Sequence, residues 1–328
     1  MLYLNEFKSR YKFFLKFIQT AKLYLGLKNS FTYQKIIYLC VIDYRYFIMK
    51  TNFSFRYAAN PADVKSYDTE KLRNEFLIQK LFTENSVNLV YSMYDRLIVG
   101  GAMPVNEKLT LETIPYLKSE NFLDRREIGI INVGGPGEIH VDGEVFELDK
   151  KEALYIGKGV KDVIFVSKDK SSPALFYINS APAHEKFPTK KVGKENAEVI
   201  QLGDENSANR RVLNKLIVNS IVKTNQLQMG LTELLPGNIW NTMPAHTHSR
   251  RMEAYFYFDL HEGQTISHFM GEPQETRHIF MQNHDAVLSP EWSIHSGAGT
   301  SNYSFIWGMA GENLDYGDMD VCAPNELR

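Results

Sequence analysis

The sequence of 328 residues predicts an all-β protein whose two related halves each form an antiparallel sandwich or barrel, with a few short helices. Short segments rich in branched and aromatic residues recur along the chain, separated by glycine, aspartate and lysine turns at intervals of about a dozen residues. The second half repeats this pattern. In a loose alignment of the halves, segment 157–162 takes the place of segment 290–295.

The first 48 residues differ in composition from the rest of the chain. They are dense in large apolar residues and carry eight lysine and arginine residues against only Glu6 and Asp43. The segment lacks the cleavage site of a signal peptide, and its most apolar part, 36–48, is too short to span a bilayer. A basic amphipathic helix at a membrane surface is an alternative. We expect 1–48 to be an N-terminal extension outside the functional fold, which begins at Met49.

The first half begins with a helix and continues with strands. Segment 68–79 is predicted to be helical, because Asp68 can cap it and apolar residues follow at helical spacing. The strand-like segments are 87–94, 96–101, 127–133, 137–142, 144–148, 153–156, 162–167 and 174–179. A polar stretch at 184–209 is predicted to be a linker. We therefore divide the fold into 49–190 and 191–328.

The second half resumes the strand pattern after this stretch. Its strand-like segments are 214–218, 226–234, 254–259, 265–270, 277–281, 285–288 and 304–309. A His-x-His sequence directly precedes the third of these segments, and the first half has no such sequence. We therefore expect a working site in the second half and a metal-free scaffold in the first.

Charge and cysteine content exclude several classes of function. Lysine and arginine number 37 against 39 aspartate and glutamate, a formal net charge of −2, which gives no reason to expect a nucleic-acid partner or stable membrane association. The two cysteines, Cys40 and Cys322, lie at opposite ends of the chain. They predict neither a disulfide framework nor a thiolate metal cluster. The expected localisation is cytoplasmic.

Four residues of the second half have the arrangement of a metal site. His246 and His248 are alternate residues, so on a strand both imidazoles point to one side. Glu253 follows, and His295 comes from a later segment. Imidazole and carboxylate groups are ligands of zinc and related metals. A solvated strand edge would explain an isolated His-x-His, but the added Glu253 and His295 favour metal binding.

Two further histidine pairs lie between these ligands. His261 and His284 stand in polar turns, and we expect both to face solvent. His268 and His278 fall in alternating strand segments, where each either lines the same cavity or points outward.

The ligand spacing resembles the paired motifs of the cupin family. It implies a bicupin, two antiparallel double-stranded β-helix (jelly-roll) barrels, although Trp292 stands where cupins usually carry glycine. Segments 243–258, 269–279, 289–300 and 305–313 resemble more specifically the 5-keto-4-deoxyuronate isomerase family, the 4-deoxy-L-threo-5-hexosulose-uronate ketol-isomerases. The resemblance extends over 66–328 through segments 72–77, 125–127, 155–159 and 188–191. Ser249 departs from the acidic residue expected there.

This resemblance implies an enzyme, an intramolecular oxidoreductase with one zinc ion per subunit. The implied ligands are His246, His248, Glu253 and His295. The implied reaction converts 5-dehydro-4-deoxy-D-glucuronate, a small keto-uronate, to 3-deoxy-D-glycero-2,5-hexodiulosonate in the degradation of pectin and related uronate polymers. Family members are also similar in forming closed homo-oligomers, so we expect a homohexamer.

The sequence does not decide which residues bind the substrate carboxylate or which residues transfer the protons of the reaction. Arg250, Arg251 and Arg277 are the candidates nearest in sequence for the carboxylate. Tyr255 and Tyr257 share the face of Glu253 and should line the cavity. The possible bases are Glu233, His268 and Glu291. No catalytic residue is assigned.

Two alternative functions stay open at this point. One is an iron or manganese cupin dioxygenase, because three histidines and one glutamate also suit those metals. The other is a non-enzymatic bicupin that binds sugar acids.

Overall fold

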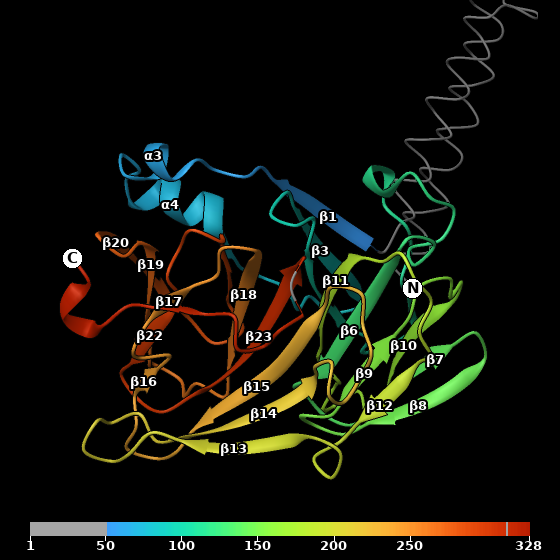
Figure 1. Cartoon of the computed structure of the whole chain (residues 1–328). Coiled ribbons are helices and arrows are strands. Elements are labelled where there is room, and N and C mark those ends of the chain that lie inside the picture. Colours follow the sequence, from blue (N-terminus) through green and yellow to red (C-terminus); the bar gives the residue numbers. More distant parts are fainter. Residues whose placement is uncertain (1–50, 313) are drawn as a thin grey trace, which may run out of the picture. The chain divides into compact units, whose positions relative to one another are not determined.

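The structure, a computed structural model, describes residues 51–312 and 314–328. The predicted extension 1–48 lies outside the described residues. Nearly all described elements are strands, which confirms the all-β prediction (Figure 1). The strands form two sheet pairs, each with one seven-stranded and one four-stranded sheet, and a separate two-stranded ribbon.

The first sheet pair uses strands from the first half of the chain. Its seven-stranded sheet has the order β1(Thr51–Arg56), β3(Ser86–Ser92), β4(Ile98–Met103), β11(Phe176–Pro182), β6(Arg126–Asn132), β9(Ala153–Ile156), β12(Lys190–Val192). Its four-stranded sheet has the order β5(Leu109–Thr110), β10(Val163–Ser167), β7(Gly137–Val141), β8(Glu144–Leu148). A short 3-10 helix, η1(Pro115–Leu117), follows β5. Strand β1 pairs in parallel with β3, and the other pairings are antiparallel.

The second sheet pair repeats this arrangement. Its seven-stranded sheet has the order β13(Glu198–Leu202), β14(Arg211–Ile217), β15(Gln228–Leu234), β23(Ser304–Gly311), β18(Arg251–Phe258), β21(Ala286–Ser289), β2(Leu77–Ile78). Its four-stranded sheet has the order β16(Trp240–Asn241), β22(Ser296–Gly299), β19(Ile266–Glu272), β20(Glu275–Met281). The ribbon joins β17(His246–Thr247) to β24(Asp320–Val321), and η2(Pro324–Glu326) follows.

One segment of the first half belongs structurally to the second sheet pair. Helices α3(Pro61–Val64) and α4(Thr69–Phe76) contact β19, β20 and β21, and β2 adds a seventh strand beside β21. The predicted helix 68–79 is correct at its start, because the Asp68 side chain accepts a hydrogen bond from the Lys71 amide. It was predicted too long. Leu77 and Ile78 leave the helix to pair with the edge of the sheet.

The predicted linker 184–209 was wrong in part. It contains β12 and also β13, whose five residues pair with β14. Strand β13 ends the order of its sheet, so several of its side chains face solvent and its composition resembles that of a loop. The division at residue 190 stays a prediction.

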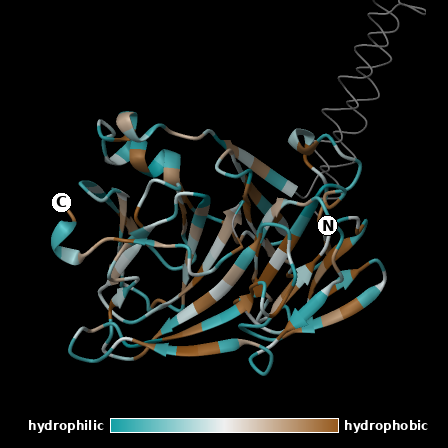
Figure 2. Cartoon of the chain, in the orientation of Figure 1, coloured by the Kyte–Doolittle hydropathy of each residue, from teal (hydrophilic) through white to brown (hydrophobic). Residues whose placement is uncertain are grey.

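The two sheet pairs have differently filled interiors. Aliphatic and aromatic residues fill the first, among them Ile98, Ile128, Ile130, Leu154, Ile156, Phe165 and Ile178. Apolar residues are concentrated in the strands, and hydrophilic residues in the connections (Figure 2).

The seven-stranded sheets of the two pairs contact each other through their outer faces. Phe256 of β18 stacks on Tyr177 of β11 with ring centroids 4.5 Å apart. A Cβ atom at Gly308 would clash with the Asn179 side chain, so glycine is needed where the sheets approach closely. Phe256 and Phe258 therefore turn toward this contact, which leaves the opposite face of β18 for the interior.

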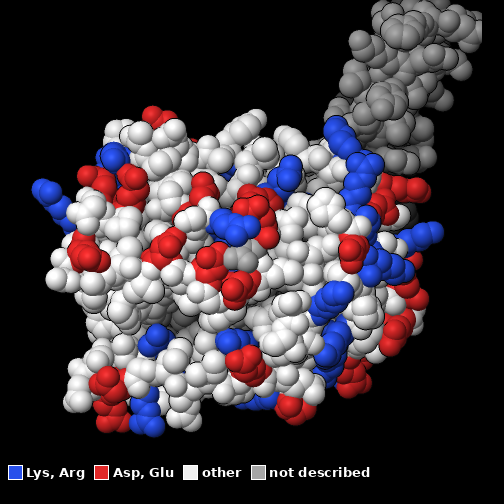
Figure 3. Space-filling view, in the orientation of Figure 1, with Lys and Arg blue, Asp and Glu red and all other residues white. Residues whose placement is uncertain are grey.

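Charged side chains of both signs are interspersed on the face shown in Figure 3, in agreement with the near-neutral composition. Among the described residues, no helix has the length and apolar character needed to cross a bilayer.

Candidate metal centre and pocket

Two strands, the turn between them and one later loop position the four predicted ligands. His246 lies on β17, His248 follows that strand, and Glu253 is the third residue of β18. His295 directly precedes β22. Glu253 and His295 are about as buried as the hydrophobic core, whereas His246 is half-buried. The structure brings all four together at the same place.

The ligand atoms of this cluster are spaced as a bound metal ion requires. The Nε2 atom of His246 lies 3.2 Å from that of His248 and 3.0 Å from that of His295. Oε2 of Glu253 lies 3.0 Å from His248 Nε2 and 2.9 Å from His295 Nε2. All four atoms fall within 4.8 Å of one another. Atoms bound at about 2.0–2.1 Å in a tetrahedron lie roughly 3.3 Å apart, so the cluster could hold a metal ion.

A carbonyl of the C-terminal segment orients one of the imidazoles. His248 donates its Nδ1 hydrogen to the carbonyl oxygen of Asp318 at 2.7 Å, which leaves Nε2 free of hydrogen and directed at the cluster. Arg251, 1 % exposed, donates to the carbonyls of Asp315, Tyr316 and Asp318. Arg251 therefore holds the segment that aligns His248.

Burial and mutual charge set the protonation of the cluster. Burial in the first place, and the nearby His295 in the second, lower the pKa of His246 from 6.5 to about 2. Burial alone would raise the pKa of Glu253, but His295 and His248 outweigh it and hold that pKa well below 4.5. At neutral pH, His246 is therefore uncharged and Glu253 ionised, as metal ligands must be.

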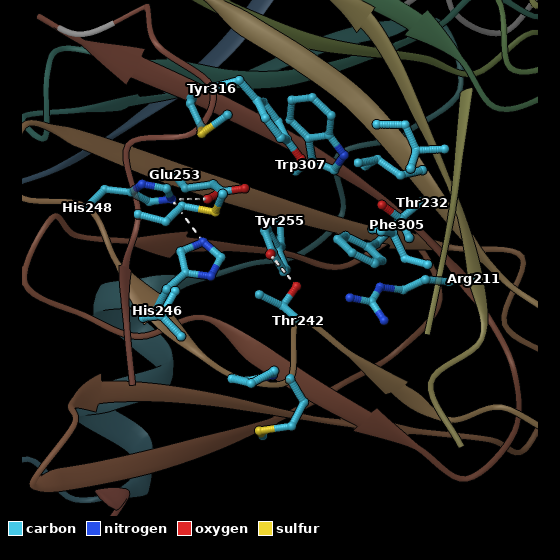
Figure 4. Close-up of a pocket in the computed structure, with 18 residues that line it drawn as sticks. Arg211, Thr232, Thr242, His246, His248, Glu253, Tyr255, Phe305, Trp307 and Tyr316 are labelled. Atoms are coloured by element: carbon cyan, nitrogen blue, oxygen red, sulfur yellow. Dashed lines mark hydrogen bonds and ion pairs between the residues drawn. The ribbon is translucent and has the colours of Figure 1, made fainter. Parts of the chain in front are cut away.

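The cluster lies in the wall of a pocket of about 370 Å³ inside the second sheet pair (Figure 4). Strands β13, β14, β15, β18 and β23 line it, together with segments 242–248 and 316–321. Its apolar walls include Ile200, Leu202, Leu213, Phe305 and Trp307. The first two belong to the segment that the sequence predicts as a linker. The volume is within the range of small-molecule sites.

Hydroxyl groups stand beside the cluster. Tyr255 lines the pocket, and its hydroxyl lies 2.8 Å from the Thr242 hydroxyl. Burial raises the pKa of Tyr255 well above 10, and the charge of Glu253 adds to the effect. Tyr255 therefore remains protonated at neutral pH and can donate a hydrogen bond.

The next interior layer holds Tyr257 and His268, whose hydroxyl and Nδ1 atoms lie 2.8 Å apart. Burial lowers the pKa of His268 from 6.5 to about 3, so its imidazole is neutral. Of the two histidines left open, His268 is buried next to the site and His278 is exposed. His284, expected to face solvent, is instead half-buried and stacks on Phe256.

The other residues proposed from the sequence for carboxylate binding or proton transfer lie away from the pocket. Arg250 pairs with Glu312 at the surface, and Arg277 pairs with Glu275 on β20. Neither these two nor Arg251 lines the pocket. Glu233 pairs with Lys151 of the first sheet pair, and Glu291 is exposed.

Arg211 lines the pocket and was missed in the sequence. It opens β14, and its guanidinium group points into the cavity opposite the metal cluster (Figure 4). The alternation of Arg211, Leu213 and Lys215 on one strand face was the available signal.

Together, the fold and the site define a bicupin-like β protein with a three-histidine, one-glutamate cluster that could bind a metal. Residues 76–322 match the family described as KduI/IolB. The chain belongs to the KduI/IolB family.

Relatives and a solved structure agree with this membership. The chain is similar to 4-deoxy-L-threo-5-hexosulose-uronate ketol-isomerase from Formosa agariphila, 61% identical over 85% of this chain and 100% of the relative. It is also similar to ketol-isomerase 1 of the same name from Bacteroides thetaiotaomicron, 60% identical over the same shares of 85% and 100%. An IolB-like protein from Salmonella typhimurium shares the fold, with a TM-score of 0.56 and 15% identity over 69% of this chain and 86% of that one. The comparisons confirm the resemblance and the expected enzyme class, a ketol-isomerase.

Proposed function

We propose that this chain is a zinc-dependent ketol-isomerase that converts 5-dehydro-4-deoxy-D-glucuronate to 3-deoxy-D-glycero-2,5-hexodiulosonate in the degradation of pectin and related uronate polymers. The observation that carries the proposal is the convergence of His246, His248, Glu253 and His295 on one point, with the first three lining the pocket. Relatives at about 60% identity that bear the isomerase name support it. A cytoplasmic homohexamer stays part of the proposal.

The donor set fits zinc. Three imidazole nitrogens and one carboxylate oxygen are preferred zinc ligands, so His246, His248, His295 and Glu253 would hold the ion. The buried Nδ1 atom of His295 has no hydrogen-bond partner among the described residues. When bound, zinc would act as a Lewis acid that polarises the substrate carbonyl and acidifies the neighbouring C–H.

The protein groups would orient the substrate and move protons around it. Tyr255, held protonated, donates a hydrogen bond to a substrate oxygen, and Thr242 can pass a proton to or from that hydroxyl. Trp307 and Phe305 shield the reacting carbons from water. Loss of the C2 proton and protonation of the aldehyde oxygen O1 give an enediol. Protonation of C1 and loss of the O2 proton then give the ketone, so the conversion needs no net proton or electron.

The test supplies the purified protein with the keto-uronate released by a pectin lyase pathway and follows the product by NMR in D2O. We expect the 2-keto isomer, deuterium at C1 and about one zinc ion per chain. An isomer without any deuterium would contradict the enediol step. Oxygen consumption with no keto isomer would instead indicate a dioxygenase, and binding without turnover a sugar-acid-binding protein.

A further inference from the structure

We propose that Arg211 binds the substrate carboxylate, so that the pocket selects open-chain acids whose carboxylate lies at the end opposite the reacting carbonyl. This inference rests on the proposed function and names the residue that decides its substrate class. The metal cluster and Arg211 stand at opposite sides of the pocket, with Tyr255 and Phe305 between them (Figure 4).

Arg211 is a half-buried cation without an acidic partner. One of its nitrogens, Nη1, donates to the carbonyl of Asn209 at 2.8 Å. Among the described residues, no carboxylate forms an ion pair with it. The groups that interact with its charge are the hydroxyls of Tyr255, Tyr316 and Tyr303, while burial lowers its pKa.

The two cations nearest to Arg211 in the chain each have an acidic partner. Lys215 lies on the same face of β14, and its Nζ atom is 2.7 Å from Oε1 of Glu198. Arg210, the preceding residue, pairs with Glu205 at 2.9 Å. A cation withdrawn from water is destabilising unless protein acceptors or the charge of a ligand satisfy it. Several backbone carbonyls satisfy the buried Arg126 and Arg251, whereas among the described residues Arg211 donates to one carbonyl. The open position of Arg211 therefore favours an anion in the pocket.

The groups that line the pocket between the metal cluster and Arg211 restrict the class of ligand further. A guanidinium group matches a carboxylate in two parallel hydrogen bonds, and only one nitrogen of Arg211 is already engaged. Leu213, Phe305 and Trp307 provide apolar wall beside it. A six-carbon chain with a deoxygenated middle and a polar group at each end is complementary to this surface.

Two acids that differ only at the end facing Arg211 test the inference. Adipate carries a second carboxylate there, and 6-hydroxyhexanoate carries a hydroxyl, while both keep a carboxylate for the metal end. Calorimetry would measure the binding of each to the metal-loaded wild type, Arg211→Met, Arg211→Lys and the matched surface control Arg210→Met. Metal content and melting temperature would show that each variant is folded and loaded.

We expect the wild type and Arg210→Met to prefer adipate by roughly tenfold to a hundredfold, the usual strength of a charge-assisted pair. Arg211→Met should abolish this preference and Arg211→Lys should keep part of it. Equal affinity for the two acids in the wild type, or an undiminished preference in Arg211→Met, would overturn the inference. Because calorimetry does not depend on turnover, a protein that prefers adipate through Arg211 but fails to isomerise the keto-uronate would contradict only the proposed function.

Discussion

The two sheet pairs share one strand order but differ in what their interiors contain. Ile128 of β6 pairs with Ile156 and Ser180, whereas Glu253 of β18 pairs with Ser289 and Met309 of the corresponding strands. An apolar residue in the first pair thus occupies the place of the carboxylate in the second. The first interior gains its stability from apolar burial. The interior of the second sheet pair has less stabilisation from apolar burial, because ionisable groups and a pocket occupy part of it.

A second carboxylate sharpens this comparison. Glu127, next to Ile128, is fully buried but points away from the first interior, toward the second sheet pair. It accepts hydrogen bonds from the hydroxyl of Tyr155 and from backbone or side-chain N–H groups of Asn225, Gln226 and Leu227. Hydrogen-bond donors of the protein surround the Glu127 carboxylate, whereas the Glu253 carboxylate faces the imidazole nitrogens of His248 and His295. Buried carboxylates in similar strands are therefore satisfied by N–H and O–H donors in one case and lie in a cluster that could bind a metal in the other.

The largest effect should come from removing a ligand of the cluster. His246→Ala is expected to lose most of its bound metal and to lower kcat/KM by at least about a thousandfold, because Lewis-acid chemistry is lost. Metal analysis and the NMR assay would measure both. The matched control is His140→Ala in the first sheet pair, which should leave metal content unchanged, because the His140 ring lies away from the cluster, 3.1 Å from the Glu138 carboxylate. Full metal retention in His246→Ala would contradict the assignment.

Glu127→Gln should destabilise the fold and leave the metal site intact. The amide nitrogen of glutamine would face N–H donors, so the substitution is expected to lower the free energy of unfolding by about 3 kcal/mol, in the range for breaking a buried charged network. Urea denaturation would measure the loss, and metal content of the folded protein serves as its control. An unchanged unfolding midpoint would show that this contact between the sheet pairs is dispensable.

The metal-free protein should lose stability at acidic pH, because the interior of the second sheet pair contains histidines that stay neutral when folded. The folded-state pKa values of His246 and His268, lowered by burial to about 2 and about 3, lie below the ordinary 6.5. Between those values the unfolded chain binds protons that the folded chain does not, so stability falls as pH falls below 6.5. The loss should reach roughly 2 kcal/mol per histidine at pH 5. Melting curves of His268→Phe, which removes one of the two groups, should show a shallower pH dependence; an identical one would contradict this account.

The smallest effect should come from Arg277→Met, although the sequence made Arg277 a carboxylate candidate. Arg277 forms a surface pair with Glu275 outside the pocket. Such pairs contribute about 0–1 kcal/mol to stability. We expect kcat/KM for the keto-uronate to stay within about twofold of the wild type. A tenfold rise in KM would place the carboxylate near β20 and count against Arg211.

Local patterns predicted the metal cluster, whereas contacts across the fold escaped prediction. His246, His248 and Glu253 lie within one short stretch, and His295 follows a recognisable turn. Their spacing alone was therefore enough to predict that the four residues form one cluster. Arg211 reaches the same cavity only because β14, β15, β23 and β18 are neighbours in the seven-stranded sheet, an order that chain position does not reveal. Leu77 and Ile78 became a strand for a similar reason, since the edge of β21 outweighed helical periodicity.

The hydrogen bond from His248 to the Asp318 carbonyl has a consequence for biosynthesis. Its two partners are separated by 70 positions in the chain. During translation His246, His248 and Glu253 leave the ribosome well before the segment that fixes the imidazole tautomer, and His295 also emerges later. A nascent chain that ends before residue 295 therefore contains only three of the four residues of the cluster. The orientation that this bond gives to His248 can therefore form only after the C-terminal segment has been synthesised.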